Sequence, residues 1–237
     1  MSATKFFHSE DIYNLQSPRE IVPVLVQVFQ PKSVVDFGCG LGTFLYCFKE
    51  QGVPKVLGMD GDWVDRSLLK KYLDENEFIS TDLQKADLVH KERYDLAISL
   101  EVAEHLSPES ADRFIENMTS LSDNIVFSAA IPGQGGQDHV NEQWPSYWIA
   151  KFEKHGYFCH DILRPYFWNN PNVLWWYKQN ILVFSKDPSF TSSLKLPRIF
   201  DLAHPEMLKA NSETLSGFRF ASKLFVKALL KKMGVRK

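Results

Sequence analysis

The chain has 237 residues, and its 27 lysines and arginines nearly balance 29 aspartates and glutamates, for a formal net charge of −2. This length suits one α/β domain with additions at its ends rather than two full domains. The balanced charge argues against the strongly basic surface that nonspecific nucleic-acid binding requires. We therefore expect no nucleic-acid partner.

The cysteines and the apolar segments bear on the compartment. Cys39, Cys47 and Cys159 form no C-x-x-C pair, which favours a reducing compartment over a disulfide framework or a zinc site. No uninterrupted apolar run reaches membrane-spanning length, and residues 1–8 lack a long apolar signal core. These features predict a soluble, cytoplasmic protein.

The first half of the chain alternates predicted helices and strands. Ser17-Pro18-Arg19-Glu20 has the form of a capping box with proline at the first helical position, and it begins a predicted helix over residues 17–30. Further helices are predicted over 43–51, 63–72 and 107–121, and strands after Pro31 and over 55–60, 78–80, 94–100 and 124–130. Strands separated by helices predict a parallel sheet.

The second half has a different pattern. A loop over 131–139 leads to a predicted helix over 145–155, and two strands are predicted over 158–165 and 180–185. Only an aromatic-rich segment joins these strands, so we expect them to pair antiparallel, since a parallel return needs a long crossover. Beyond Lys186 no strand pattern remains, and residues 187–237 are expected to form an appendage.

The most informative segment runs from Val34 to Gly42, where a buried-strand pattern ends at Asp36 and three glycines follow at alternate positions. Such glycines let the backbone approach a ligand closely, while the next helix directs free N–H groups to the same place. The D-x-G-x-G-x-G form resembles the first motif of the class I S-adenosylmethionine-dependent methyltransferases. A plain glycine-rich turn is the alternative.

The resemblance covers residues 30–186 and implies a Rossmann-like α/β fold. Its mostly parallel seven-stranded sheet would carry one antiparallel strand and helices on both faces, in a domain spanning 1–186. Asp60 ends the second strand, where a carboxylate can accept hydrogen bonds from two ribose hydroxyls. Asp82 matches the family position that meets the adenine, or it is only a turn former. The S-adenosylmethionine site would comprise Asp36, Gly38, Cys39, Gly40, Gly42, Asp60, Gly61, Asp82, Leu83 and Leu100.

A second motif, Glu101-Val102-Ala103-Glu104-His105, follows the fourth strand. It is similar to the metal-binding segment of the quinone-pathway O-methyltransferases and of the small-RNA 2′-O-methyltransferases, where another histidine completes the site. His139 is the candidate here, so Glu101, Glu104, His105 and His139 would hold Mg²⁺ or Mn²⁺. The same pattern occurs without a metal. In that case His139 or His105 is the expected base, and Glu101, His105 and His139 are the candidate catalytic residues.

The region from Gly133 to Tyr157 bears on the acceptor. It is similar to small methyltransferases found alongside glycosyltransferases in glycan-building systems, which implies a sugar or glycan substrate and a glycosyltransferase partner. Aromatic side chains suit the C–H faces of sugars, and amides suit their hydroxyls. The candidates are Trp144, Tyr147, Trp148, Tyr166, Trp168, Trp175, Trp176 and Tyr177, with Gln137, Gln143, Asn169, Asn170 and Asn172.

We therefore predict an O-methyltransferase that acts on a sugar hydroxyl in a glycan or nucleotide-sugar pathway. A quinone or small-phenol O-methyltransferase and a catalytically silent binding module are the alternatives. The C-terminal appendage adds a predicted basic amphipathic helix, with Arg219, Lys223, Lys227 and Lys231 at every fourth position. Such a helix could contact a membrane surface or an acidic partner, or pack on its own domain.

Overall fold

The computed structural model describes residues 14–85, 88, 90–190 and 200–216. The chain divides into two compact units, Met1–Leu202 and Ala203–Lys237. The first unit extends past Lys186, where the sequence predicted its end, and the second contains helix α8 (Pro205–Ser216). The predicted basic stripe from Arg219 to Lys231 lies outside the described residues. Among the helices that the structure describes, none has the length and apolar character that a membrane crossing requires.

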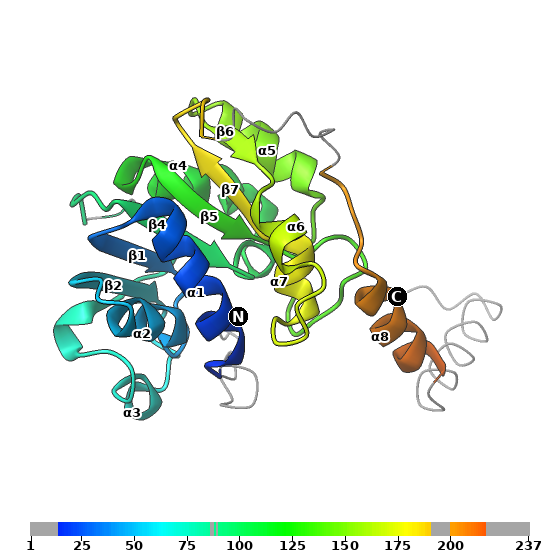
Figure 1. The fold of residues 1–237 in the computed structure, drawn as a ribbon, viewed down its shortest axis with the longest axis horizontal. Coiled ribbons are helices and arrows are strands. Elements are labelled where there is room, and N and C mark those ends of the chain that lie inside the picture. Colours follow the sequence, from blue (N-terminus) through cyan, green and yellow to red (C-terminus); the bar gives the residue numbers. More distant parts are fainter. Residues whose placement is uncertain (1–13, 86–87, 89, 191–199, 217–237) are drawn as a thin grey trace. The chain divides into compact units, whose positions relative to one another are not determined.

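A seven-stranded sheet forms the centre of the first unit, in the order β3-β2-β1-β4-β5-β7-β6 (Figure 1). All its neighbouring strands pair parallel except at β7, which is antiparallel to both β5 and β6. The fold prediction is confirmed, with one reversed strand among seven. The strands are β1 (Ser33–Phe37), β2 (Lys55–Asp60), β3 (Phe78–Ser80), β4 (Leu96–Leu100), β5 (Asn124–Ser128), β6 (Phe158–His160) and β7 (Leu182–Ser185).

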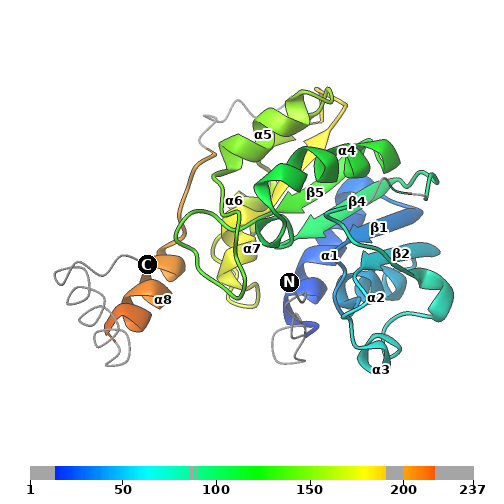
Figure 2. The same cartoon turned by 180° about the vertical axis from the view of Figure 1, so that it is seen from behind.

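Both faces of the sheet are covered, because successive side chains of a strand point to opposite faces. Val34 packs with α1 (Gln16–Phe29), α2 (Thr43–Glu50) and α6 (Leu163–Phe167) on the face seen in Figure 1. Val35 packs with α4 (Ala111–Leu121) and α5 (Pro145–Glu153) on the face seen in Figure 2. The buried alternation along β1 therefore explains the three-layer arrangement.

Three local predictions were wrong in extent. The helix predicted over 63–72 is a single turn, α3 (Arg66–Leu69), which Asp65 caps. The strand predicted over 158–165 ends at His160, and the chain then forms α6. The segment between the last two strands also contains α7 (Trp175–Asn180), so it is not a simple hairpin connection. The antiparallel pairing itself is confirmed, from Phe158 opposite Ser185 to His160 opposite Val183.

The predicted capping box at Ser17 and Glu20 does not form, since α1 begins at Gln16 and has no side-chain cap. Ser17 Oγ instead accepts a hydrogen bond from the Leu174 N–H at 3.0 Å. The Glu20 carboxylate accepts from Asn170 Nδ2 at 2.9 Å and from Asn172 Nδ2 at 3.3 Å. The two polar side chains therefore join the start of α1 to the segment that precedes α7.

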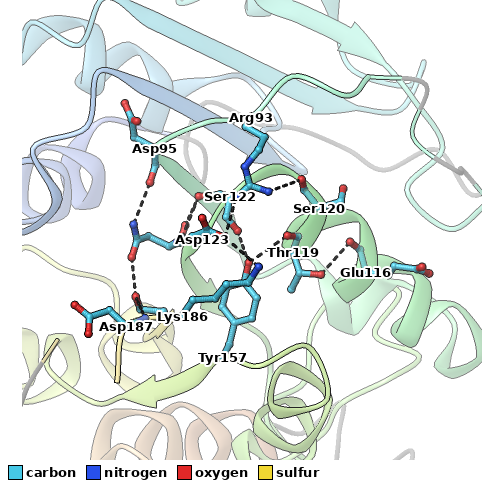
Figure 3. A network of polar contacts seen from close by, with 12 residues as sticks. Arg93, Asp95, Glu116, Thr119, Ser120, Ser122, Asp123, Tyr157, Lys186 and Asp187 are labelled. Carbon is cyan, nitrogen blue, oxygen red and sulfur yellow. Dashed lines mark hydrogen bonds and ion pairs between the residues drawn. The ribbon is translucent and has the colours of Figure 1, made fainter. Parts of the chain in front are cut away.

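A polar network ties the amino ends of β4 and β5 to the end of β7 (Figure 3). Asp123 pairs with Arg93 at 2.7 Å and with Lys186 at 3.1 Å. The Tyr157 hydroxyl donates to the backbone carbonyl of Ser122. This network lies at the opposite end of the strands from the glycine turn, so it fixes the sheet without entering the site described next.

Candidate active site

A cavity of about 510 Å³ lies at the carboxyl ends of β1, β2 and β4. Its walls come from the glycine turn after β1, the ends of β2 and β4, the loop after β5, the start of α1 and helix α7. Carboxyl ends of parallel strands are the usual ligand-binding edge of an open α/β sheet. The two motifs predicted from the sequence therefore face one cavity.

The glycine turn requires glycine for two physical reasons. Gly38, Gly40 and Gly42 have φ values of +84°, +52° and +82°, in the region that residues with a side chain rarely adopt. Space is also lacking, since a Cβ on Gly38 would lie 2.4 Å from Val102 Cγ2, and one on Gly42 would lie 2.6 Å from Leu73 Cδ1. The turn therefore brings bare backbone to the cavity wall.

Two buried carboxylates lie beside this turn. Asp60 accepts hydrogen bonds from the Gly40 N–H at 2.8 Å and from the Gly61 N–H at 2.6 Å. Burial, and next the charge of Asp60, raise the pKa of Asp36 well above its usual value. Burial and the same two carboxylates raise the pKa of the Cys39 thiol, which therefore stays protonated at neutral pH. Burial therefore disfavours the charged form of Asp36, and a positively charged group bound beside it would stabilise that form.

Of the other predicted cofactor residues, Asp82, Leu83 and Leu100 border the cavity, whereas Gly40, Gly42 and Gly61 are not in its lining. Asp82 lines it, although its carboxylate also accepts from the Gln84 N–H at 3.0 Å and pairs with Lys85 Nζ at 3.1 Å. Leu83 and Leu100 are buried and line the cavity. The Trp63 ring covers Gly61, where a Cβ would lie 2.3 Å from ring atoms. Asp82 therefore combines the turn-forming role and the cavity position that were alternatives in the sequence.

The predicted metal ligands Glu104, His105 and His139 come together. Each offers one ligand atom, and these atoms all lie within 4.8 Å of one another. The rings of His105 and His139 are nearly perpendicular, with centroids 4.9 Å apart. Glu104 is fully buried, and neither of its carboxylate oxygens has a hydrogen-bond partner in the described part of the chain. A buried carboxylate without a donor is costly unless a cation or a proton compensates it.

Protonation states in this cluster follow from burial. Burial, and next the charge of Glu101, raise the pKa of Glu104 well above its usual value. Burial, and next the neighbouring His139, lower the pKa of His105 to about 4, so its imidazole is neutral at pH 7. A carboxylate whose proton is displaced by the metal and a neutral imidazole are ligands that divalent transition metals accept. The donor set therefore fits a divalent cation.

Glu142 organises the loop that carries His139. Its carboxylate accepts from His139 Nδ1 at 2.9 Å and from the N–H groups of Gly133 and Gly135 at 2.8 and 2.7 Å. Burial alone would raise the pKa of Glu142, but these hydrogen bonds lower it. Metal-binding histidines commonly have such a carboxylate on the second ring nitrogen. The Val140 and Asn141 N–H groups also donate to the Glu104 carbonyl, so the two motif-bearing loops are directly joined.

Glu101 differs from its three predicted partners. Its carboxylate is bound by the side-chain amides of Gln134 at 2.7 Å and Asn180 at 3.0 Å. Burial raises the pKa of Glu101, and the hydrogen bond from Asn180 is the largest of the effects that oppose the shift. Glu101 lines the cavity with the other three residues, and its role as a metal ligand stays a prediction.

The aromatic residues predicted to contact a sugar separate into two groups. Trp175, Trp176 and Tyr177, all on α7, line the cavity. Trp148 is buried in the core, and Tyr166 is 66% exposed outside the cavity lining. Among the predicted amides, Gln137 lines the cavity, whereas Asn170 and Asn172 bind Glu20. Fewer of the predicted aromatic and amide residues therefore line the cavity than the sequence predicted.

Comparison with known proteins identifies the domain. A family described as a methyltransferase domain matches residues 13–171, which is most of the first unit. The chain belongs to this family. The methyltransferase has no sequence match among curated proteins.

Solved structures share the fold of the methyltransferase at low sequence identity. The methyltransferase domain of bacterial CtHen1-C is 20% identical, with a TM-score of 0.51, over 73% of this chain and 98% of that one. An O-methyltransferase family protein from Burkholderia thailandensis is 14% identical, with a TM-score of 0.52, over 72% of this chain and 56% of that one. Magnesium protoporphyrin IX methyltransferase from Synechocystis was solved with bound S-adenosylmethionine. It is 18% identical, with a TM-score of 0.51, over 73% of this chain and 79% of that one.

The enzyme is an S-adenosylmethionine-dependent methyltransferase, and its cavity fits that cofactor. Gly38 and Cys39 of the glycine turn line the cavity together with Asp36 and Asp60. Asp60 lines the cavity, and its carboxylate accepts from the backbone N–H groups of Gly40 and Gly61. Asp36 would face the positively charged methionine end, and Asp60 the ribose.

Sequence reasoning missed four polar residues of the methyltransferase site, namely Gln134, Glu142, Gln179 and Asn180. Glu142 had a usable signal, because it follows His139 by three residues in the same motif. The three amides had none, because Gln134 lies on the loop after β5 while Gln179 and Asn180 end α7, and only the folded chain brings them together.

Proposed function

We propose that the protein is an O-methyltransferase that acts on a neutral sugar hydroxyl with the help of a divalent cation. The observation that carries this proposal is the buried, unpartnered Glu104 carboxylate beside His105 and His139, in the cavity that contains the glycine turn. A hydroxyl acceptor explains why such a cluster would lie there.

The chemistry gives each residue a role. Bound S-adenosylmethionine supplies an electrophilic methyl group. An aliphatic hydroxyl has a pKa far above 7, so a cation that binds its oxygen would help it to lose a proton. Glu104, His105 and His139 would hold the cation, which would be Mg²⁺ or Mn²⁺, and Glu142 would keep the His139 ring in place. Adjacent sugar hydroxyls suit this role because two of them can chelate one cation.

The charge of the cavity supports a neutral acceptor. Its described lining contains six carboxylate residues and no lysine or arginine. Proteins that bind phosphate backbones place basic side chains around them, so a polyanionic acceptor such as RNA is disfavoured. The six residues are Asp36, Asp60, Asp82, Glu101, Glu104 and Asp138.

The aromatic wall of α7 supports a ring-shaped acceptor and admits a second candidate. Trp175 and Trp176 meet edge to face, with centroids 5.4 Å apart, and could contact the C–H face of a sugar. The same wall would also suit a catechol, whose two adjacent hydroxyls could bind the same cation. A small-phenol O-methyltransferase is therefore the second candidate. A glycosyltransferase partner and a cytoplasmic location stay proposals that rest on the sequence.

An acceptor screen tests the proposal. The protein would be incubated with methyl-labelled S-adenosylmethionine and neutral glycans, catechols or short RNA, each with Mg²⁺, Mn²⁺ or excess chelator. We expect label on a glycan in the presence of a cation, and little label on the other acceptors. Transfer to catechols alone would favour the second candidate, whereas transfer to RNA, or full glycan transfer in chelator, would contradict the proposal.

A further inference from the structure

The backbone of Glu101 is held in a strained conformation at the end of β4. Its φ is +57°, which is uncommon for a residue with a side chain. Its N–H donates to the carbonyl and to the hydroxyl oxygen of Ser128 at 3.0 and 3.1 Å, so the neighbouring end of β5 fixes it. Strain of this kind persists where the surrounding structure over-determines it, and it concentrates at functional sites.

Two buried amides bind the Glu101 carboxylate, and a third amide bonds to both of them. Gln134 Nε2 donates to Oε2 at 2.7 Å, and Asn180 Nδ2 donates to Oε1 and Oε2 at 3.0 and 3.2 Å. Asn180 Nδ2 also donates to Gln134 Oε1 at 2.8 Å, and Gln179 Nε2 donates to Gln134 Oε1 and Asn180 Oδ1 at 3.1 and 3.0 Å. The amides are only 0 to 8% exposed, so water cannot readily replace these bonds.

The direction of every bond in this network follows from one group. Both carboxylate oxygens of Glu101 accept hydrogen bonds, so Gln134 and Asn180 turn their NH₂ groups toward Glu101. Their oxygens then point away and accept from Gln179. The network is thus built around a fixed carboxylate, and fully satisfied buried networks of this kind hold a single arrangement.

We propose that Gln134 and Asn180 are positioning residues that hold the Glu101 carboxylate so that it accepts a hydrogen bond from the acceptor hydroxyl. The two amides make three hydrogen bonds to a carboxylate that offers about four acceptor positions. Glu101 also lines the cavity, so an acceptor hydroxyl bound there could donate to it. The proposal rests on the proposed function in that it requires a hydroxyl acceptor, but it holds for a sugar or a phenol.

Helix α7 contributes both to the wall of the cavity and to the network around Glu101. Its first three residues, Trp175, Trp176 and Tyr177, line the cavity, and its last two, Gln179 and Asn180, belong to the network. One short helix therefore sets both the wall that would contact the acceptor ring and the carboxylate that would orient its hydroxyl. Removing the amide bonds should impair orientation of the acceptor more than binding of the cofactor.

A double-mutant cycle tests the proposal, using Asn180→Leu, Glu101→Gln and the double variant. Gln134→Leu provides a second cycle if Asn180→Leu folds poorly, and Asn117→Leu, at a buried amide of α4 outside the cavity lining, is the matched control. We expect each single variant to lower kcat by about tenfold or more, with unchanged affinity for S-adenosylmethionine. The double variant should lose no more than Glu101→Gln alone, because the amide acts only through the carboxylate.

A normal kcat for both Asn180→Leu and Gln134→Leu would overturn the proposal. Losses of kcat that multiply in the double variant would also overturn it. Either result would show that the amides do not act through Glu101. A crystal structure of Asn180→Leu provides a readout without turnover, and it should show the Glu101 carboxylate displaced. An unmoved carboxylate would also contradict the proposal. If the wild-type protein methylates no hydroxyl acceptor but the carboxylate moves, the proposed function fails while the positioning role stands.

Discussion

Asp60 Oδ2 accepts a hydrogen bond from the backbone N–H of Gly40 at 2.8 Å, which joins the end of β2 to the middle of the glycine turn. The other oxygen accepts from the Gly61 N–H at 2.6 Å. A single carboxylate thus fixes the cofactor-binding turn and lines the cavity.

Replacing Asp60 with asparagine should weaken cofactor binding. The amide nitrogen cannot accept a hydrogen bond, so one backbone N–H loses its partner and the ribose loses a charged acceptor. We expect the affinity for S-adenosylmethionine, measured by calorimetry, to fall by about tenfold or more. Asp65→Asn, at the cap of α3, should bind normally. Unchanged affinity in Asp60→Asn would contradict the assignment.

Gly38→Ala and Gly52→Ala separate backbone strain from steric contact. Both glycines have φ near +83°, but a Cβ on Gly52 meets nothing within 4 Å, whereas one on Gly38 meets Val102 at 2.4 Å. Urea unfolding should show a loss of about 1 kcal/mol for Gly52→Ala and at least about 1 kcal/mol more for Gly38→Ala. Adding Val102→Ala to Gly38→Ala should restore part of that difference. Equal losses at the two glycines would show that the contact with Val102 is unimportant.

The raised pKa of Asp36 predicts a pH-dependent stability. Because the folded-state pKa lies above the unfolded value, folding favours the protonated form. The resulting stability is fully present below the unfolded pKa and is lost as the pH rises through the folded pKa. Asp36→Asn should therefore be more stable than the wild type at pH 8 in the absence of cofactor, yet bind S-adenosylmethionine more weakly. Urea unfolding at pH 5 and pH 8 measures this, and a larger advantage for Asp36→Asn at pH 5 would contradict the sign.

Glu142→Gln tests how the cation site is supported. The variant keeps the shape of the side chain but removes the charge that holds His139 Nδ1. Loss of such a supporting carboxylate typically lowers metal affinity by about 10-fold to 100-fold. Titration of the Glu142→Gln variant with Mn²⁺ should show this decrease. The control variant is Glu109→Gln, since Glu109 is exposed and outside the cavity lining, and its affinity for Mn²⁺ should be unchanged. Equal Mn²⁺ affinity in both variants would separate Glu142 from the cation site.

The parts of the fold that were predictable are those that local chemistry determines. The glycine turn, the buried strands around it and the cluster of Glu104, His105 and His139 follow from short motifs at strand ends, because parallel strands end at one edge of a sheet. Ser17 and Glu20 were misassigned because distant partners, Leu174, Asn170 and Asn172, outcompete a local helix cap.

The network around Glu101 could not be predicted for a related reason. Its amides come from the loop after β5 and from the end of α7, where no helix was predicted and Asn180 was assigned to the strand predicted over 180–185. Only the packing of α7 against the end of the sheet places Asn180 next to Glu101. The spacing of residues along the chain does not indicate such contacts.

A cation held by Glu104, His105 and His139 is proposed to assist methyl transfer to a sugar hydroxyl. The most direct test of this role is methyl transfer to a glycan acceptor by chelator-treated wild-type protein and by His139→Ala, before and after addition of Mg²⁺ or Mn²⁺. We predict that the cation restores wild-type transfer at least about tenfold, and that His139→Ala recovers far less while it still binds S-adenosylmethionine. Full transfer in excess chelator, or equal recovery by His139→Ala, would show that no such cation takes part in the transfer.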